Sequence, residues 1–475
     1  MSKEKSMYSV DPRDRVGPGE KLCYSIGYAG AEGFSTIINS YLMLFLMMVG
    51  GVSGTFIGTM MLCARIWDAI NDPILGTLAD HTHTRFGRYR PYTLAAVPMA
   101  IIFALLFFVP DLSTTGKMVY YTIVYILYGM CFTVLELPYF GLASAMTNNP
   151  QERASITSWS RIAARIPAVA FPLLLSWLTV QLGDQQGYFV NALCVGGIAV
   201  VCALFAFFGC KERAVRYDDE PKEEGKKKSS SFRDFINVIK GNRALIVVMI
   251  VQLFFTFNTI LSEMINTYYL TYSLGSPALL TGVGVALIAV GCCIGQFFYP
   301  YVATKVQSCK VIMMIGVPIY CGMLALCYVA GNISIPLYLV MIVITNVFTG
   351  ALQINVINLC FEVCDKLEYK NGVRSDATVF SIVSFLMKLS AGLASTIAGF
   401  GLTLVGFEGM GEVTIEVTQE MANGVAVLRF LMPGIFAAIS FVAVLFYPIK
   451  KSEIVEIRAE LTRRHADDHK DEEQQ

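Results

Sequence analysis

The chain has 475 residues, of which 55% are hydrophobic and only 15% are charged, whereas a soluble globular chain has roughly 25% charged residues. Lysines and arginines balance aspartates and glutamates at a formal net charge of zero, so no bulk field predicts a nucleic-acid partner. This is the composition of a chain whose solvent is lipid, not of a soluble globular protein.

The apolar segments have the length of membrane-spanning helices, which need about 20 mostly apolar residues. The first twenty residues are charged and hold no apolar core, so we expect no cleavable signal peptide. Twelve spans are predicted, at approximately 22–50, 54–80, 91–110, 117–145, 153–182, 187–210, 243–274, 278–304, 311–330, 334–364, 374–405 and 424–449. The longer ones predict tilt or protrusion from the bilayer. They do not alternate with period two, which excludes a membrane β-barrel.

Basic residues in the loops predict the orientation. The segments that carry them are the N-terminal tail, the 81–90 loop, the 211–242 segment, the 305–310 loop and the C-terminal tail. All five fall on one side of a twelve-span count, and positive charge marks the cytoplasmic side. We therefore expect a protein of the inner or plasma membrane with both termini in the cytoplasm.

The longest polar interruption divides the spans into six plus six, which is the plan of the major facilitator fold. The predicted fold class is therefore an all-α membrane protein with twelve transmembrane helices in two six-helix bundles. We interpret the central polar segment as a solvated hinge. The predicted units are a cytoplasmic N-terminal tail at 1–21, a bundle at 22–210, a central cytoplasmic loop at 211–242, a second bundle at 243–449 and a cytoplasmic tail at 450–475.

Cysteines and histidines carry no predicted chemistry. The thirteen cysteines are scattered, mostly inside apolar runs, with neither zinc-site spacing nor a disulfide framework. The four histidines lie in loops or in the C-terminal tail, which excludes a histidine proton relay inside the membrane. We expect no enzymatic activity and no cofactor.

Charged residues inside the spans are the candidate functional residues, because each costs about 2.5–3.5 kcal/mol on insertion. Those of the first half are Glu32, Arg65, Asp68, Asp72, Glu136, Arg161 and Arg165. Four of them lie about nine to twelve residues from the cytoplasmic ends of their helices, close to the bilayer midplane. Transporters of this plan keep their binding sites at that depth. In the second half, Glu263 and Glu362 are interpreted as interfacial.

The 54–80 helix carries the densest cluster of charge. Arg65, Asp68 and Asp72 are spaced i, i+3 and i+7 and share one helix face, and Asn71 lies one turn from Asp68. Two carboxylates and an amide oxygen can offer ligands to a small cation, so Na⁺ could bind at Asp68 and Asp72. The two carboxylates could instead share a proton. A third interpretation is an ion pair with Arg65 that only locks helices.

Several motifs resemble the glycoside–pentoside–hexuronide:cation symporters, a family that includes the melibiose permease. The most specific is the stretch Arg65-Ile66-Trp67-Asp68-Ala69-Ile70-Asn71-Asp72-Pro73, followed by Gly76, Asp80, Arg85, Gly87, Arg88 and Pro91. Supporting matches are Lys21-Leu22, Tyr24, Gly27 and Gly30, then Glu136-Leu137-Pro138-Tyr139, then Asp365, Tyr369, Arg374 and Asp376. The resemblance spans nearly the whole chain. It implies alternating-access symport of a sugar-like solute, such as a glycoside, pentoside or hexuronide, with Na⁺ or H⁺.

The resemblance also implies site residues. The cation ligands would be Asp68, Asn71, Asp72 and Thr133, and the solute ligands would be Glu32, Glu136, Arg161 and Lys388. The gating residues would be Asp80, Arg85, Arg88 and Arg374. Asn71 and the lack of membrane histidine favour Na⁺ over H⁺. No partner is expected beyond the small-molecule solute and the lipid bilayer.

The solute site departs from the family pattern. Ala31-Glu32 stands where the permease has Lys-Asp, and Phe140 stands where a tryptophan is expected. We hypothesise that Arg165 replaces the missing lysine as the charge partner of Glu32. Two rival functions stay open. One is transport of a lipid-like or other amphipathic solute, which the Phe140 replacement permits, and the other is a non-transporting sensor on a transporter scaffold.

Overall fold

The structure is a computed structural model, and it describes most of the chain as helices. The described residues are 16–80, 84–147, 150–213, 242–371, 376–407, 417–449, 451–454, 456–457 and 460. Most of the predicted N-terminal tail, central loop and C-terminal tail lies outside these ranges.

The first half of the chain forms one group of helices. In chain order they are α1 (Pro18–Ile37), the π-helical turn η1 (Ile38–Leu42), α2 (Met43–Met48), α3 (Gly54–Asp80), the 3₁₀ turn η2 (Arg90–Ala95), α4 (Ala96–Leu106), α5 (Thr114–Met146), α6 (Pro150–Ala163), α7 (Arg165–Leu182) and α8 (Asp184–Gly209). Because η1 continues the backbone of α1 into α2, these three segments make a single span.

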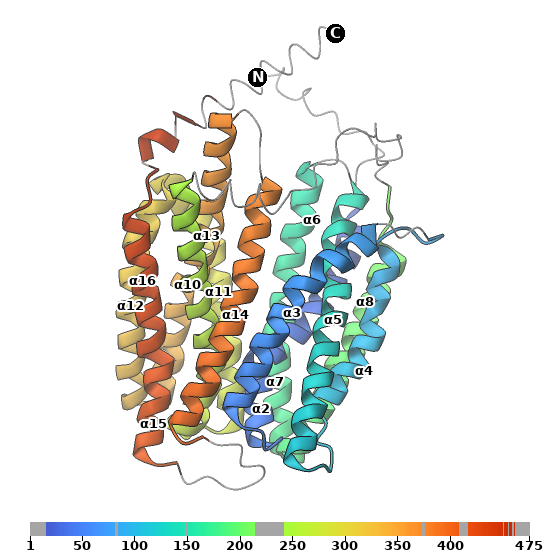
Figure 1. Ribbon diagram of the computed structural model, residues 1–475, viewed down its shortest axis with the longest axis vertical. Helices are drawn as coiled ribbons and strands as arrows, with labels where there is room; N and C mark the ends of the chain where they lie inside the picture. Colours follow the sequence, from blue (N-terminus) through green and yellow to red (C-terminus); the bar gives the residue numbers. More distant parts are fainter. Residues whose placement is uncertain are drawn as a thin grey trace.

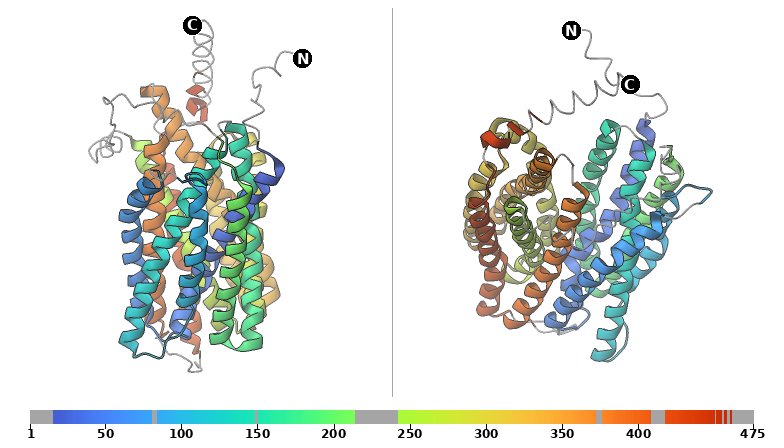
Figure 2. Two further views of the ribbon diagram at one scale, coloured as in Figure 1. Left: turned by 90° about the vertical axis from the view of Figure 1, so that its right-hand side faces the viewer. Right: turned by 45° about the horizontal axis from the view of Figure 1, so that its top comes forward.

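The second half forms a second group beside the first (Figure 1). Its elements are α10 (Arg243–Tyr268), the π-helical turn η4 (Tyr269–Ser273), α11 (Ala278–Val306), α12 (Cys309–Ile333), α13 (Ile335–Asn371), α14 (Asp376–Leu404), α15 (Gln419–Ala426), the π-helical turn η5 (Val427–Leu431) and α16 (Met432–Leu445). The right-hand view of Figure 2 also shows the two groups side by side.

Ten helices among the described residues are long and apolar enough to cross a membrane. They correspond to ten of the twelve predicted spans. The other two predicted spans are α3 and the helix at 90–106. The first is 27 residues long but carries four charged side chains, and the second is a shorter apolar helix. Both lie within the first group of helices, so a criterion of length and apolar composition misses two helices that belong to this bundle.

The predicted span 153–182 has a local break at Ala164, between α6 and α7, where the backbone stays right-handed helical and the N–H of Ala164 still donates to the carbonyl of Ser160 at 2.9 Å. Pro167 explains the position of the break, because a proline has no N–H to donate to the carbonyl four residues earlier, here that of Ala163. The break separates Arg161, on the last turn of α6, from Arg165, on the first turn of α7. Both arginines nevertheless lie in one membrane span, Ser155–Leu182.

The two halves pack closely where α3 meets α14. A Cβ atom on Gly399 would overlap the carbonyl oxygen of Gly54, and one on Gly58 would lie 2.9 Å from the carbonyl oxygen of Ser395. The hydroxyl of Thr396 donates to the carbonyl of Gly58 at 3.2 Å. Small residues let two membrane helices approach at backbone distance, so this contact between the halves depends on the absence of side chains.

We expect Gly399→Ala to destabilise the protein, although alanine favours a helix over glycine by roughly 0.5–1 kcal/mol. The new methyl group must push α3 away from α14, and overpacking of this kind costs about 1–3 kcal/mol. Gly197→Ala is the matched control, since a Cβ there meets nothing within 4 Å. Thermal unfolding in detergent should show a lower midpoint for Gly399→Ala alone. Equal midpoints for the two variants would contradict the close packing.

Candidate functional site

A polar cavity of about 210 Å³ lies between the two halves. Its charged lining residues are Glu32, Arg161 and Arg165 from the first half and Glu263 from the second. Its polar lining includes Tyr28, Ser35, Thr36, Asn39, Ser40 and Gln353. The cavity therefore offers both hydrogen-bond donors and acceptors to a small solute, and both halves contribute to it.

Glu32 projects from α1 into this cavity, where the hydroxyl of Tyr28 donates to its Oε1 at 3.0 Å. Tyr28 lies one helical turn earlier, so the pair follows from i, i+4 spacing. Glu136 on α5 is an electrostatic neighbour of Glu32 and of Arg161, and also of Asp68 on α3. Glu136 thus stands between the cavity and the acidic cluster of α3. The side chain of Phe140, the other predicted solute ligand on α5, lies outside the described residues.

Arg165 has a different partner from the one hypothesised. Its Nη2 donates to Oε1 of Gln296 on α11 at 2.9 Å, and the described residues show no ion pair between Arg165 and Glu32. Arg165 lies on α7, which packs against α11, the helix that carries Gln296. Both side chains still line the same cavity.

One glutamate of the second half, Glu263, is not interfacial, contrary to the sequence interpretation. Glu263 lines the central cavity, and the hydroxyl of Ser40 donates to its Oε1 at 3.2 Å. Glu362 on α13 is buried and accepts a hydrogen bond from the hydroxyl of Tyr447 at 3.3 Å.

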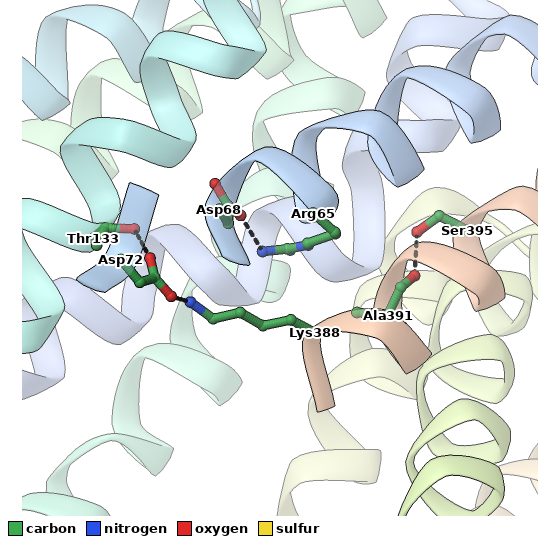
Figure 3. Close-up of polar contacts among 7 residues, drawn as sticks. All are labelled: Arg65, Asp68, Asp72, Thr133, Lys388, Ala391 and Ser395. Atoms are coloured by element: carbon green, nitrogen blue, oxygen red, sulfur yellow. Dashed lines mark hydrogen bonds and ion pairs between the residues drawn. The ribbon is translucent and has the colours of Figure 1, made fainter. Parts of the chain in front are cut away.

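The acidic residues of α3 form a second cluster (Figure 3). Nη1 of Arg65 lies 3.4 Å from Oδ2 of Asp68. Oδ1 of Asp72 accepts a hydrogen bond from the hydroxyl of Thr133 on α5 at 3.0 Å. The ammonium group of Lys388, on α14, forms an ion pair with Oδ2 of Asp72. This ion pair joins the two halves of the molecule and places Lys388, predicted as a solute ligand, at the acidic cluster.

The cluster is largely shielded from solvent and balanced in charge. Asp68 is 5% exposed and Asn71 is 6% exposed, and Nδ2 of Asn71 has no hydrogen-bond partner. Two carboxylates face two cationic side chains, those of Arg65 and Lys388. A small cation that entered this cluster would therefore have to compete with an ammonium group that is already bound.

The predicted gating loop is held by a residue that the sequence analysis missed. The carboxylate of Glu212 accepts hydrogen bonds from the backbone N–H groups of Arg88, Tyr89 and Arg90 at 2.8, 2.8 and 2.9 Å. Gly87 has a φ of 113°, which favours glycine. The guanidinium of Arg85 stacks on the ring of Phe86. The side chain of Asp80 and all of Arg374 lie outside the described residues.

Arg429 is a second residue that the sequence analysis missed. It lies on η5 in the last span and is 2% exposed. The rule that a charged residue inside a membrane is costly could have identified Arg429, because the same rule identified the charged residues of the first half. Its neighbours in the sequence are uniformly apolar, so it does not form a motif.

Comparison with known proteins gives a consistent family and fold. A family model described as MFS/sugar transport protein matches residues 23–451. The isoprimeverose transporter of Lactiplantibacillus pentosus is 26% identical over 97% of this chain and 95% of its own length. The glucuronide carrier protein homolog of Escherichia coli (strain K12) is 26% identical over 93% of this chain and 94% of its own.

Solved structures share the fold at low sequence identity. A bacterial homolog of the human lysosomal transporter Spinster, inward-facing and unoccupied, aligns with a TM-score of 0.68 at 12% identity, covering 93% of this chain and 99% of that one. A D-xylose–proton symporter aligns with a TM-score of 0.64 at 11% identity, covering 92% and 98%. These similarities confirm the predicted fold class.

Proposed function

We propose a solute and a coupling mechanism for a chain that belongs to the MFS/sugar transport protein family, and is therefore a membrane transporter rather than an enzyme. The protein is a cation-coupled symporter of a sugar-like solute: a glycoside, a pentoside or a hexuronide. The observation that carries this proposal is the arrangement of two neighbouring sites. A polar cavity lies between the halves, and an acidic cluster beside it is closed by a lysine from the opposite half.

The lining of the cavity favours a hydroxyl-rich solute. A hydroxyl group both donates and accepts hydrogen bonds, and the carboxylates and guanidinium groups of the cavity supply strong partners for each. Four charged side chains line this space of about 210 Å³. A lipid-like solute would need an apolar wall for its tail, so the cavity argues against the rival amphipathic substrate. The related isoprimeverose transporter and glucuronide carrier homolog point in the same direction.

The coupling cation, Na⁺ or H⁺, binds at the acidic cluster. Asp68 and Asp72 supply the negative charge, and Asn71 and Thr133 supply further oxygen atoms if the ion is Na⁺. In the arrangement seen here the Lys388 ammonium satisfies Asp72, so cation binding displaces Lys388. This releases an ion pair between the halves and couples the cation to their relative movement. No cofactor is required.

The solute site communicates with the cation site through Glu136. This residue is an electrostatic neighbour of Glu32 and Arg161 on one side and of Arg65 and Asp68 on the other. A change of charge at the cluster therefore alters the field at the solute. Binding of both partners favours rocking of the two halves about the cavity, and binding of one partner alone does not.

Glu32→Gln tests the solute site, because it preserves shape and removes charge. A hydrogen bond to a charged group contributes about 1.5–3 kcal/mol, and about 1.4 kcal/mol corresponds to tenfold in affinity. We expect the apparent affinity for the transported sugar to fall by more than about tenfold. Uptake into proteoliposomes over a range of solute concentrations measures it.

Glu420→Gln is the matched control for this variant, since Glu420 lies on the exposed first turn of α15, distant in sequence from the cavity-lining residues. The control should retain the affinity of the wild type. An unchanged affinity in Glu32→Gln would remove Glu32 from the solute site.

We also propose that the protein lies in the inner or plasma membrane with both termini in the cytoplasm, as the distribution of basic loop residues indicates. A cysteine introduced at Glu420, between α14 and α16, should then react with a membrane-impermeant maleimide on intact cells, above the level of the parent protein. Labelling that requires cell lysis would reverse the orientation.

A further inference from the structure

A small recess of about 50 Å³ continues from the central cavity into the second half of the molecule. Glu263, Ile288, Cys292 and Gln353 line both spaces. The recess is further lined by Ser262, Tyr320, Asn346, Thr349 and Arg429. None of these residues takes part in the proposed cation site, so the recess is a separate feature of the second half.

Arg429 is a buried cation for which the described residues provide no ion pair. Its Nε donates to Oδ1 of Asn266 at 3.3 Å, and its guanidinium lies over the ring of Phe430, 5.2 Å from the centroid. Nη1 has no hydrogen-bond partner among the residues that the structure describes. Glu263 lines the same recess, but the described residues show no ion pair between it and Arg429, and its Oε1 accepts a hydrogen bond from Ser40. An unpaired charge inside a membrane is costly, so this guanidinium is expected to find an anion.

Several buried polar groups near Arg429 have no hydrogen-bond partner among the described residues. Nδ2 of Asn258 and Nδ2 of Asn266 are buried and have no partner, and the hydroxyl of Ser262 is also unpaired. Oδ1 of Asn258 accepts from Tyr320 at 3.1 Å, and Oδ1 of Asn266 accepts from Tyr338 at 2.7 Å as well as from Nε of Arg429. Among the described residues Glu263 is therefore the only charged acceptor that lines the recess, and it forms no ion pair with Arg429 there.

The backbone presents Arg429 in an unusual way. It lies on a π-helical turn between α15 and α16, and such turns inside α-helices are frequent at functional sites. The wider turn moves one residue out of the regular helical register. Arg429 is the one charged residue of this turn, Val427–Leu431.

We propose that the recess binds the anionic group of the transported solute, and that Arg429 selects an acidic, hydroxyl-rich solute over its neutral analogue. The inference rests on the proposed function and names the substrate class within it. Together the cavity and the recess are lined by three arginines and two glutamates, a net charge of 3 − 2 = +1, which complements one negative charge. The recess has room for roughly one or two water molecules, hence for a carboxylate but not for a sugar ring, which would remain in the main cavity.

Methyl β-glucuronide and methyl β-glucoside test the proposal, because they differ only in a carboxylate at the position of a hydroxymethyl group. Both are titrated against the purified full-length protein by calorimetry at fixed chloride concentration. We expect the wild type to bind the glucuronide at least about tenfold more tightly, as one charge-assisted hydrogen bond predicts. Arg429→Gln should remove this preference and leave binding of the glucoside unchanged. Arg429→Lys, which keeps the charge, should retain part of it.

Arg153→Gln is the matched control, since Arg153 is exposed on α6, and it should retain the full preference. Binding of the neutral glucoside by Arg429→Gln shows that the variant is folded. The proposal is overturned if Arg429→Gln keeps the preference for the glucuronide. It is also overturned if a normally eluting Arg429→Lys loses both ligands equally.

Sodium sulfate separates a solute subsite from a site for free inorganic anions. If sulfate alone stabilises the protein through Arg429 while the two glycosides bind equally, the recess holds a free anion and the solute subsite is wrong. If neither glycoside binds to the wild type but the stabilisation by sulfate disappears in Arg429→Gln, the proposed sugar transport fails while the anion site stands.

Discussion

Replacing Asp72 with asparagine is expected to abolish cation-driven accumulation of the solute. Asp72 accepts a hydrogen bond from Thr133 of the first half and forms an ion pair with Lys388 of the second half. The asparagine keeps the size of the side chain but removes one of two negative charges. The loss of a charged ligand should weaken cation binding by roughly tenfold to a hundredfold. The solute should still bind, because its ligands lie in the separate central cavity, but it should only equilibrate across the membrane.

Accumulation of labelled solute in proteoliposomes under an imposed Na⁺ or proton gradient measures this loss. Asp111→Asn is the matched control, because Asp111 is exposed in the loop between α4 and α5, and it should accumulate solute as the wild type does. If Asp72→Asn still concentrates the solute when the cation gradient is imposed, the acidic cluster of α3 is only structural.

Replacing Lys388 with methionine is expected to have two opposite effects. Breaking a buried ion pair by removing one partner costs about 3–5 kcal/mol, and the partial exposure of this pair favours the lower end. The protein should therefore be less stable without the coupling cation. Its affinity for the cation should rise by more than about tenfold, because a unit charge about 4 Å away is worth about 4 kcal/mol at an effective dielectric constant of 20.

Thermal unfolding in detergent at increasing Na⁺ concentration, and again at decreasing pH, measures both effects. Lys388→Met should start from a lower midpoint and regain stability at lower cation concentration than the wild type. Lys451→Met, at an exposed position, should follow the wild type. A lower midpoint that no cation restores would mean that Lys388 is a structural partner of Asp72 and does not compete with the ion.

The sequence predicted which charged residues lie close together inside the protein. A charged side chain is costly in lipid, so it is restricted to polar sites that are shielded from the lipid. Depth along the helices therefore brought Glu32 and Arg165 into one cavity, and the i, i+3 spacing on α3 gave the pair of Arg65 and Asp68. The two-bundle architecture followed from span length and from the long polar interruption. Both arguments are local, and both concern properties that a single helix carries by itself.

Contacts between the halves could not be predicted in this way. The pairing of Lys388 with Asp72 and of Arg165 with Gln296 depends on how α14 meets α3 and how α11 meets α7. No periodicity within one helix specifies these contacts. The π-helical turns were equally hidden, and with them the recess around Arg429. Pro167 is an exception, since its missing N–H could have indicated the break in the 153–182 span.

The most direct test of the central claim is accumulation of solute against its own gradient by the purified protein. Proteoliposomes are given an inward Na⁺ gradient or an inward proton gradient, with glycosides, pentosides and uronides as labelled probes. A symporter should concentrate one of these probes above its external concentration under one of the two gradients, and an ionophore for that cation should release it. Uptake that only equilibrates, whichever gradient is imposed, would contradict cation-coupled symport.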